Sequence, residues 1–293
     1  MSDSPDVPEV LALLRAATAA DGVRPLSERA ELQVQHGGGR GLGVRDGAAL
    51  VGYAHLADGV AEGVVHPDHR RRGFGTALTA RLLATAGEGP LDVWAHGDLP
   101  GSAGLLARHG FVRDRVLLQL RRDLAGVDPD PSPALPEGVR VLTFRPGRDE
   151  EAWLRVNAAA FATHPEQGAW TAADLRLREA EPWFDPEGFF LAWRGDPDDG
   201  GELLGSHWTK VHPPGDGADE AVGEVYVVGI APEAQGLRLG GALTDIGLAH
   251  LRGRGLRQVL LYVEEANTAA VHLYRGRGFT RFSADVSWRR APA

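Results

Sequence analysis

Apolar and polar positions recur regularly between residues 224 and 279, and they predict a run of four elements. Residues 224–228 alternate as in a pleated strand, so Glu224, Tyr226 and Val228 are expected on one face, and the strand is expected to end in a bulge. The next element is a helix, marked by apolar residues at helical spacing: Leu243, Ile246, Leu248 and Leu251. A second strand covers residues 258–263, and Asn267 opens a short helix.

The remainder of the chain shows the same two periodicities. In the first half they predict four helices: one over residues 8–20, one that begins at residue 27, one that follows the turn at 70–75 and ends at residue 86, and one over residues 101–109. They also predict strands over residues 41–45, 48–56, 60–65, 91–95 and 116–121. In the second half they predict strands over residues 139–144 and 203–211 and helices over residues 150–161 and 171–181. The alternation of both types of element indicates a mixed α/β (α+β) fold.

A glycine-rich turn at residues 235–241 separates the strand at 224–228 from the helix that follows it. A helix N-terminus has unpaired N–H groups and a positive dipole end, so such a turn is suited to bind a pyrophosphate without a metal ion. Its spacing is neither that of a P-loop nor that of a dinucleotide-binding fold. Both of those nucleotide-binding functions are therefore excluded.

The turn occurs twice, which indicates an internal duplication. Residues 70–75 repeat residues 235–240 at an offset of 165, and residues 110–111 repeat residues 278–279 at an offset of 168. At these offsets three residues of the second copy, Glu224, Tyr262 and Tyr274, stand opposite Gly59, Trp94 and Leu106. The first copy therefore keeps the turn and lacks the ionisable groups at those positions, so it is expected to be catalytically degenerate.

A segment rich in proline and acidic residues lies between the two copies, at residues 126–137, and it has no apolar periodicity. We interpret it as a linker between an N-terminal domain at residues 1–125 and a C-terminal, catalytic domain at residues 138–293. A chain of 293 residues is long enough for each domain to bury a core of its own.

Composition narrows the classes of function. The net charge of −9 argues against nucleic-acid binding, and no long apolar run or leader-like segment predicts a membrane span or export, so a cytoplasmic protein is expected. The absence of cysteine excludes disulfides and a cysteine nucleophile, and Lys210 is the only lysine.

The two turns resemble the [QR]-x-x-G-x-[GA] signature of the GCN5-related N-acetyltransferase (GNAT) superfamily. The first copy matches it through Arg70, Gly73 and Gly75, whereas the second copy has Arg238 at the position of the middle glycine. The resemblance implies two tandem GNAT domains, each with a mixed, mostly antiparallel sheet, flanking helices and a splayed strand pair. It also implies acetyl-CoA as the cosubstrate, with no metal.

Acetyl transfer to an amine needs a base, a polarised thioester carbonyl and an acid for the leaving thiolate. Glu224 is the candidate base, directly or through a water, because an α-amino group has a pKa of about 7.7 to 8.0 and needs no strong base. Backbone N–H groups at residues 228–230 could polarise the carbonyl. Either Tyr262 or Tyr274 could supply the proton, or both tyrosines could simply pack in the core. Glu224 could instead be an edge-strand carboxylate that faces water.

Within the superfamily, the segments EVYVVGIAPEAQGLRLGGALT, LLYVEEANTAAVHLYRGRGF and AFATHPEQGAW resemble a tandem actinobacterial branch that acetylates the cysteine amine of a cysteinyl-glucosaminyl-inositol. By position, this resemblance implies Glu224 as base and substrate contact, Tyr262 as general acid and substrate contact, and Tyr274 as the alternative acid. It also implies three further substrate contacts: Glu28, Glu166 and Lys210. Glu28 could instead be a solvated first-turn carboxylate.

The same resemblance implies where acetyl-CoA binds. In the second copy the positions are Val228, Gly229, Ile230, Gln235, Gly236, Leu237, Arg238, Leu239, Gly240, Gly241, Asn267, Thr268, Ala269, Ala270, Val271 and His272. In the first copy, where a second and non-productive acetyl-CoA would bind, they are Gly63, Val64, Val65, Arg71, Arg72, Gly73, Phe74, Gly75 and Thr76.

The expected partner is a small polyol amine, with no nucleic acid or membrane, and the expected assembly is a monomer. Two alternative functions stay open from sequence: acetylation of another amine, such as an aminoglycoside or a peptide N-terminus, and a non-catalytic acyl-CoA sensor.

Overall fold

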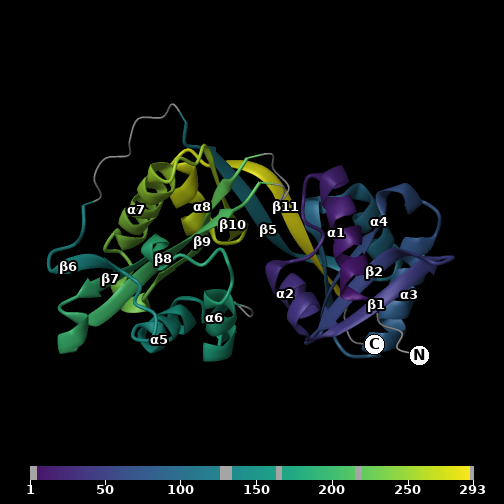
Figure 1. Ribbon diagram of the computed structural model, residues 1–293, viewed down its shortest axis with the longest axis horizontal. Coiled ribbons are helices and arrows are strands. Elements are labelled where there is room, and N and C mark those ends of the chain that lie inside the picture. Colours follow the sequence, from purple (N-terminus) through teal and green to yellow (C-terminus); the bar gives the residue numbers. More distant parts are fainter. Residues whose placement is uncertain (1–4, 126–133, 163–166, 215–219, 291–293) are drawn as a thin grey trace.

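A computed structural model describes residues 5–125, 134–162, 167–214 and 220–290. Within these ranges the chain forms two lobes joined by one continuous 11-stranded sheet, with strand order β1-β2-β3-β4-β11-β5-β10-β9-β8-β7-β6 (Figure 1). The architecture is the mixed α/β fold that the sequence predicts.

The first lobe contains helices on both faces of its strands. Its helices are α1 Val7–Asp21, α2 Glu28–His36, α3 Phe74–Ala86 and α4 Pro100–Arg108, with short 3-10 turns at Pro67–His69 and His96–Asp98. Its strands are β1 Arg40–Asp46, β2 Ala49–Ala57, β3 Val60–Val65, β4 Leu91–Ala95 and β5 Val112–Asp123. Helices α1 and α2 cover one apolar cluster and α3 and α4 cover another, on opposite faces of the sheet.

The second lobe follows the same plan. Its helices are α5 Glu150–Ala160, α6 Ala172–Glu179, α7 Leu239–Gly253 and α8 Thr268–Arg275, with 3-10 turns at Gln167–Ala169, Pro186–Gly188, Pro197–Asp199 and Pro232–Ala234. Its strands are β6 Val139–Thr143, β7 Phe189–Arg194, β8 Glu202–His212, β9 Val222–Ile230, β10 Gln258–Glu264 and β11 Thr280–Arg290. On the α5 and α6 side the core is aromatic: Trp153, Phe189 and Trp208 are fully buried, and the rings of Phe189 and Trp208 stack 4.4 Å apart.

The two lobes exchange their last strands. Strand β11 of the second half inserts between β4 and β5, and β5 of the first half inserts between β11 and β10. Figure 1 shows these two long strands crossing from one lobe to the other. Residues 117 and 285 occupy equivalent positions in the two copies, at the offset of 168, and they pair with each other in the β5–β11 ladder. The pair Leu117↔Asp285 therefore marks the centre of the crossing. Each lobe therefore lacks a complete sheet without the other.

A splayed strand pair occurs in each lobe. Strands β9 and β10 are parallel and paired only from Gly223 to Val225, although β9 continues to Ile230. Strands β3 and β4 are likewise parallel and pair only from Val60 to Glu62. Beyond these rungs the two strands of each pair separate. The backbone N–H and C=O groups of β9 and β3 on these edges therefore have no partner in β10 or β4.

The bulge of β9 lies in the middle of the strand and not at its end. In the β8–β9 register, Trp208 pairs with Val227 and Thr209 pairs with Val225, so Tyr226 is the extra residue. One extra residue reverses the alternation of faces beyond it. Tyr226 therefore packs on the α5 and α6 side, whereas Val228 packs against the core below α7 and α8. The prediction that Val228 shares the face of Glu224 and Tyr226 was wrong for this reason.

The two glycine-rich turns have the same backbone path with different residues. Each contains two positions with positive φ: Arg71 (62°) and Gly73 (90°) in the first copy, and Gly236 (84°) and Arg238 (60°) in the second. The offset of 165 superimposes Arg71 on Gly236 and Gly73 on Arg238. An arginine in the left-handed region costs roughly 1–2 kcal/mol relative to its usual conformations, so the surrounding turn must impose this path in both copies.

The strand exchange predicts that neither half folds alone. In a fragment of residues 1–125, the gap between β4 and β5 that β11 fills would leave two unpaired edges and an open core. We expect this fragment to show no cooperative urea unfolding by circular dichroism. Co-expressed with residues 138–293, it is expected to elute from size-exclusion chromatography as a folded 1:1 complex. A cooperative transition for residues 1–125 in isolation would contradict the interpretation.

Candidate active site

The turn before α7 is built to receive an anion. Helix α7 begins at Leu239 with Arg238 as its N-cap, and no side chain caps it. The N–H groups of Leu239, Gly240 and Gly241 have no acceptor within the helix, because they belong to its first turn. Side chains cap α2 and α6, and Asn267 caps α8 by accepting from the N–H of Ala270, whereas α1, α3, α4 and α5 have no side-chain cap either. The uncapped N-terminus lies directly after β9, beside the splay, where a pyrophosphate would be stabilised by N–H groups and the helix dipole.

Glu224 lies next to the point where β9 and β10 separate. It pairs in register with Leu260 on β10, one rung before the ladder ends, and only 6% of its surface is exposed. Its Oε2 lies 2.6 Å from Nε2 of His212, the last residue of β8. The carboxylate is therefore held at the splay by its contact with His212.

Glu28 reaches the second lobe from the first turn of α2. Its Oε2 accepts a hydrogen bond from Lys210 Nζ at 2.6 Å, and its Oε1 accepts one from the Tyr226 hydroxyl at 2.9 Å. Arg178 of α6 donates from Nε to the same hydroxyl at 2.7 Å. Burial raises the pKa of Glu28, but the charge and hydrogen bond of Lys210 outweigh it, so the net pKa is lowered.

Lys210 is enclosed by aromatic rings as well as by Glu28. Its ammonium group lies 4.1 Å from the ring centroid of Trp183 and 5.2 Å from that of Tyr226, and 5% of the side chain is exposed. The lysine therefore lies at the boundary of the two lobes, on the β8–β9 ladder that also holds Glu224.

Tyr262 and Tyr274 occupy different surroundings. Tyr262 is on β10 with 40% of its surface exposed, and its hydroxyl accepts a hydrogen bond from Gln119 Nε2 of β5 at 2.5 Å. Although part of the Tyr262 side chain is exposed, burial of its hydroxyl end raises the pKa of Tyr262, and the charge of Glu224 raises it further. Tyr274 lies on the buried face of α8 against Phe279, and burial raises its pKa to about 12. Both side chains are thus protonated donors near neutral pH.

The first lobe contains a buried ionic cluster that sequence reasoning missed. His96, after β4, lies between two carboxylates: Nε2 is 3.1 Å from Glu62 Oε2, and Nδ1 is 3.0 Å from Asp285 Oδ2 of β11. Glu62 also accepts a hydrogen bond from the Ser27 hydroxyl at 2.6 Å and one from the Ser27 backbone N–H. Burial alone would lower the pKa of His96, but Asp285 and Glu62 raise it to about 10.

The turn of the first copy has the same backbone and different side-chain contacts. Arg70, at the signature's first position, makes two hydrogen bonds to Asp21, at 2.7 and 2.6 Å, and Arg72 pairs with Asp46 at 2.9 Å. Helix α3 begins at Phe74 with Gly73 as an N-cap and no side-chain cap. The residues predicted to bind a second acetyl-CoA lie on this turn, at the end of β3 and in the first turn of α3.

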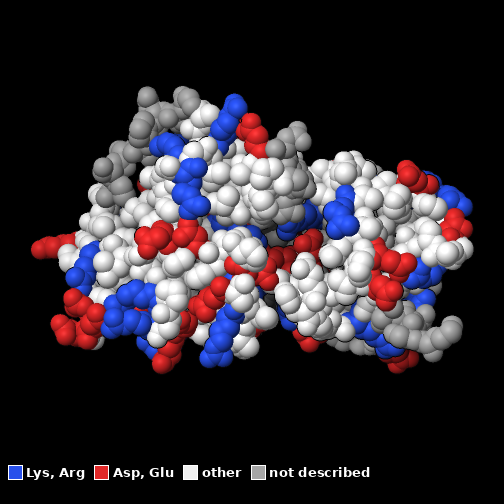
Figure 2. All heavy atoms as spheres, in the orientation of Figure 1, with Lys and Arg blue, Asp and Glu red and all other residues white. Residues whose placement is uncertain are grey.

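The structure brings together Glu28, Lys210 and Glu224 and sets Tyr262 across the splay from them. Glu166 lies outside the described residues. Both acidic and basic side chains lie along the junction of the lobes on the face drawn in Figure 2.

Sequence reasoning also missed His212, Tyr226 and Arg178. His212 follows Lys210 by two residues on β8, so period-2 alternation could have placed it on the same face. Tyr226 was assigned to the face of Glu224 without a role. Arg178 carried no signal, because it reaches the site from α6 through a tertiary contact alone.

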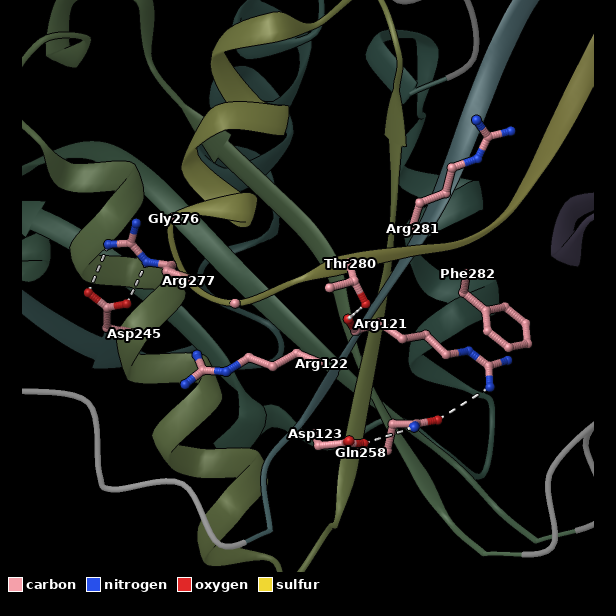
Figure 3. Close-up of a pocket in the computed structure, with 11 residues that line it drawn as sticks. Arg121, Arg122, Asp123, Asp245, Gln258, Gly276, Arg277, Thr280, Arg281 and Phe282 are labelled. Atoms are coloured by element: carbon pink, nitrogen blue, oxygen red, sulfur yellow. Dashed lines mark hydrogen bonds and ion pairs between the residues drawn. The ribbon is translucent and has the colours of Figure 1, made fainter.

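A cavity at the surface of the second lobe lies away from this site. It has a volume of about 820 Å³ and lies where β10 begins and β5 ends (Figure 3). Four arginines line it, of which Arg277 is paired with Asp245 and Arg121 lies over the ring of Phe282. No predicted site residue lines this cavity.

The fold, the splayed strands and the uncapped turns define a GNAT acetyltransferase with two copies of the fold. The family model "Acetyltransferase (GNAT) family" matches residues 153–279. A tandem GNAT protein from the clavulanic acid biosynthesis pathway superposes with a TM-score of 0.71 at 22% identity, covering 98% of this chain and 95% of the other. A GCN5-related N-acetyltransferase from Sphaerobacter thermophilus gives a TM-score of 0.69 at 25% identity, with coverage of 98% and 94%.

The chain belongs to the mycothiol acetyltransferase family. It is 68% identical to the mycothiol acetyltransferase of Geodermatophilus obscurus, over 99% of this chain and 96% of that one. It is 56% identical to that of Thermobispora bispora, with coverage of 97% and 96%. These relatives confirm the predicted superfamily and the predicted tandem branch.

The described residues contain no helix with the length and apolar character of a membrane span. They also contain no group of three or more His, Cys, Asp or Glu side chains placed to bind a metal ion.

The raised pKa of His96 predicts a pH dependence of stability. Between pH 6.5, the ordinary pKa of histidine, and about 10, the folded state binds one proton more at His96 than the unfolded state does. The free energy of unfolding should therefore fall with rising pH in this window, by at most about 1.4 kcal/mol per pH unit from this group. His55, Glu31 and Tyr262 are the other titratable groups coupled to the cluster.

Urea unfolding of the wild type and of His96→Gln at pH 6, 7, 8 and 9 measures this contribution. We expect the difference between the two proteins to be greatest near pH 6 and to shrink as the pH rises. A difference that stays constant from pH 6 to pH 9 would show that His96 is not charged in the folded protein.

Proposed function

We propose that the protein transfers the acetyl group of acetyl-CoA to the cysteine amine of cysteinyl-glucosaminyl-inositol (desacetylmycothiol), the last step of mycothiol biosynthesis. The observation that carries the proposal is the position of Glu224, buried at the rung where β9 and β10 separate and bonded to His212. The names of the full-length relatives support the same reaction.

In this proposal the turn at residues 235–241 and the first turn of α7 hold the pyrophosphate of acetyl-CoA, and residues 228–230 and 267–272 flank its acyl-bearing arm. Acetyl-CoA supplies the activated acetyl thioester. The N-terminus of α7 and the edge of β9 fit such a ligand, because the helix has no side-chain cap and the strand has no β10 partner beyond Val225.

The chemistry is direct attack by the amine nitrogen on the thioester carbonyl. Glu224, with His212 as its partner, accepts a proton from the amine, directly or through a water. The C–N bond forms, the C–S bond breaks, and a tyrosine hydroxyl donates a proton to the leaving sulfur. Tyr262 is the proposed donor because it lies close enough to Glu224 for the carboxylate to affect its pKa, and Tyr274 is the alternative.

Recognition of the polyol is assigned to Glu28, Lys210 and Glu166, with Glu224 and Tyr262 contacting the cysteinyl end. Glu28 and Lys210 are mutually bonded and lie at the lobe boundary, so a hydroxyl-rich ligand there meets both an acceptor and a donor. This assignment makes the first lobe, through α2, part of the substrate site.

Removal of the base should reduce turnover strongly. We expect Glu224→Gln to lower kcat by about 10²-fold or more, because general-base catalysis typically contributes 10²–10⁴-fold. Tyr262→Phe should lower kcat by a similar factor, and Tyr274→Phe by less than about threefold. Purified proteins are incubated with acetyl-CoA and the cysteinyl pseudodisaccharide, and the N-acetylated product is quantified by mass spectrometry.

Three outcomes are informative. No acetylated product from the wild type would reject the proposed reaction. Full activity of Glu224→Gln would remove Glu224 from the role of base. A large loss in Tyr274→Phe with none in Tyr262→Phe would assign the acid to Tyr274.

We further propose that the chain consists of a GNAT domain at residues 1–125, which binds a second acetyl-CoA without turnover, and a catalytic GNAT domain at residues 138–293. The offset of 165 gives a matched pair of variants, Leu237→Asp and Arg72→Asp, which place a carboxylate at the same position of each turn. Repulsion of the pyrophosphate should abolish binding at the altered turn only.

Native mass spectrometry counts bound acetyl-CoA and chains in each variant. We expect one chain with two acetyl-CoA molecules in the wild type, and one acetyl-CoA in each variant. Only Leu237→Asp should lose activity. A wild type that binds a single acetyl-CoA, retained in Arg72→Asp, would restrict binding to the second lobe.

A further inference from the structure

We infer that Glu62 and His96 of the first lobe are positioning residues, which act through Ser27 to fix the carboxylate of Glu28 at the lobe boundary. The inference rests on the proposed function, in that Glu28 is taken as a substrate contact. It assigns a use to the degenerate lobe besides the binding of a second acetyl-CoA.

A continuous chain of contacts connects the cluster to the site. Asp285 contacts His96 at 3.0 Å, His96 contacts Glu62 at 3.1 Å, and Glu62 accepts from the Ser27 hydroxyl at 2.6 Å. Ser27 is the N-cap of α2, and its hydroxyl oxygen accepts from the backbone N–H of Ala30. Glu28 is the next residue, the first of the helix.

Helix α2 has nine residues, of which only Ala30 and Leu32 are buried. Its contacts through Arg29 to Asp58, Gln33 to His55 and His36 to Glu181 all lie on the C-terminal side of Glu28. Glu62 holds its N-terminus by two hydrogen bonds, one to the hydroxyl and one to the backbone N–H of Ser27. Because both bonds converge on the residue before Glu28, they determine where the Glu28 side chain leaves the helix and how it meets Lys210 and the Tyr226 hydroxyl.

Stability alone is a poor explanation for this cluster. Three ionisable side chains at the boundary of the lobes are largely withdrawn from water, with Glu62 7% and Asp285 8% exposed. Buried ion pairs often stabilise a protein no more than apolar residues of the same size would, because desolvation offsets their attraction. Their directional bonds, in contrast, fix geometry, and here they bring together β3, the end of β4 and β11 beneath α2.

Asp285 makes the arrangement depend on the strand exchange. It belongs to the C-terminal strand, and its Oδ1 also accepts from the backbone N–H of Gly97 at 2.8 Å. The path therefore starts in the second half of the chain, crosses the first lobe and returns to the second lobe at Lys210. A shift of β11 relative to β4 would move Glu28 through this path.

The only lysine of the chain provides a readout that does not depend on turnover. Protein labelled with ¹⁵N at the lysine ammonium should give one side-chain signal from Lys210, protected from exchange by burial and by Glu28. Glu62→Gln and His96→Gln should shift or broaden this signal toward that of Glu28→Gln. Asp149→Asn, which alters a buried carboxylate bonded to Arg145, is the matched control and should leave the signal unchanged.

Kinetics supply the second readout. In Glu62→Gln and His96→Gln we expect the KM for the cysteinyl amine to rise about tenfold, with kcat and the KM for acetyl-CoA within twofold of wild type. The Asp149→Asn control should change neither KM. If Glu62→Gln fails to fold, Ser27→Ala removes the hydroxyl bond of this path, while the bond from the backbone N–H of residue 27 and the Glu62–His96 contact remain; the same changes are then expected to be smaller.

The failures of the two proposals are distinguishable. An unchanged Lys210 signal in Glu62→Gln and His96→Gln, with a clear change in Glu28→Gln, overturns the positioning role. An unchanged KM for the amine together with a lowered melting temperature does the same, because it indicates a purely structural role. Absence of wild-type turnover, with the expected change in the Lys210 signal, rejects the proposed substrate and leaves the positioning role supported.

Discussion

The reciprocal pairing of β5 and β11 is the constraint on which the rest of the molecule depends. Each strand completes the sheet of the lobe to which it does not belong in sequence, so the sheet is continuous from β1 to β6. This pairing fixes the rotation of one lobe relative to the other. It also brings Gln119 of β5 to the Tyr262 hydroxyl and Asp285 of β11 to His96. The candidate active site is thus shared between halves of the chain that are distant in sequence.

Within that frame, the lobes have diverged in chemistry more than in shape. Both retain a splay after three paired rungs and an uncapped helix after the turn. Each lobe has a carboxylate and a histidine next to its splay: Glu224 with His212 in the second lobe, and Glu62, on the last paired rung of β3 and β4, with His96 in the first. In the first lobe Asp285 and Ser27 complete this pair into a buried cluster next to α2. In the proposed function, the duplicated fold has one site for acetyl transfer, in the second lobe, and the first lobe contributes to substrate recognition.

Much of the fold could be predicted from local pattern, and the parts that could not have a common cause. The strands at 60–65 and 258–263, the turns and the repeat follow from periodicity and spacing within short windows of sequence. The exchange of β5 and β11 joins residues 112–123 to residues 280–290, and no local pattern encodes that pairing. The bulge at Tyr226 was misplaced because both alternatives fit the same five residues. The position of Glu28 could not be predicted locally, because its partners Lys210 and Tyr226 lie in the other lobe. The Glu62–His96 cluster could not be predicted either, because its side chains come from three elements that meet only in the folded protein.

The paired left-handed positions of the two turns carry a lesson for recognising such sites. One turn has arginine first and glycine second, and the other has the reverse order, yet the main chain follows one path. At these two positions the duplication preserved the positive φ angles, while the amino acids changed. An amino-acid consensus therefore matches the second turn only in part, whereas a template written in φ values would match both turns.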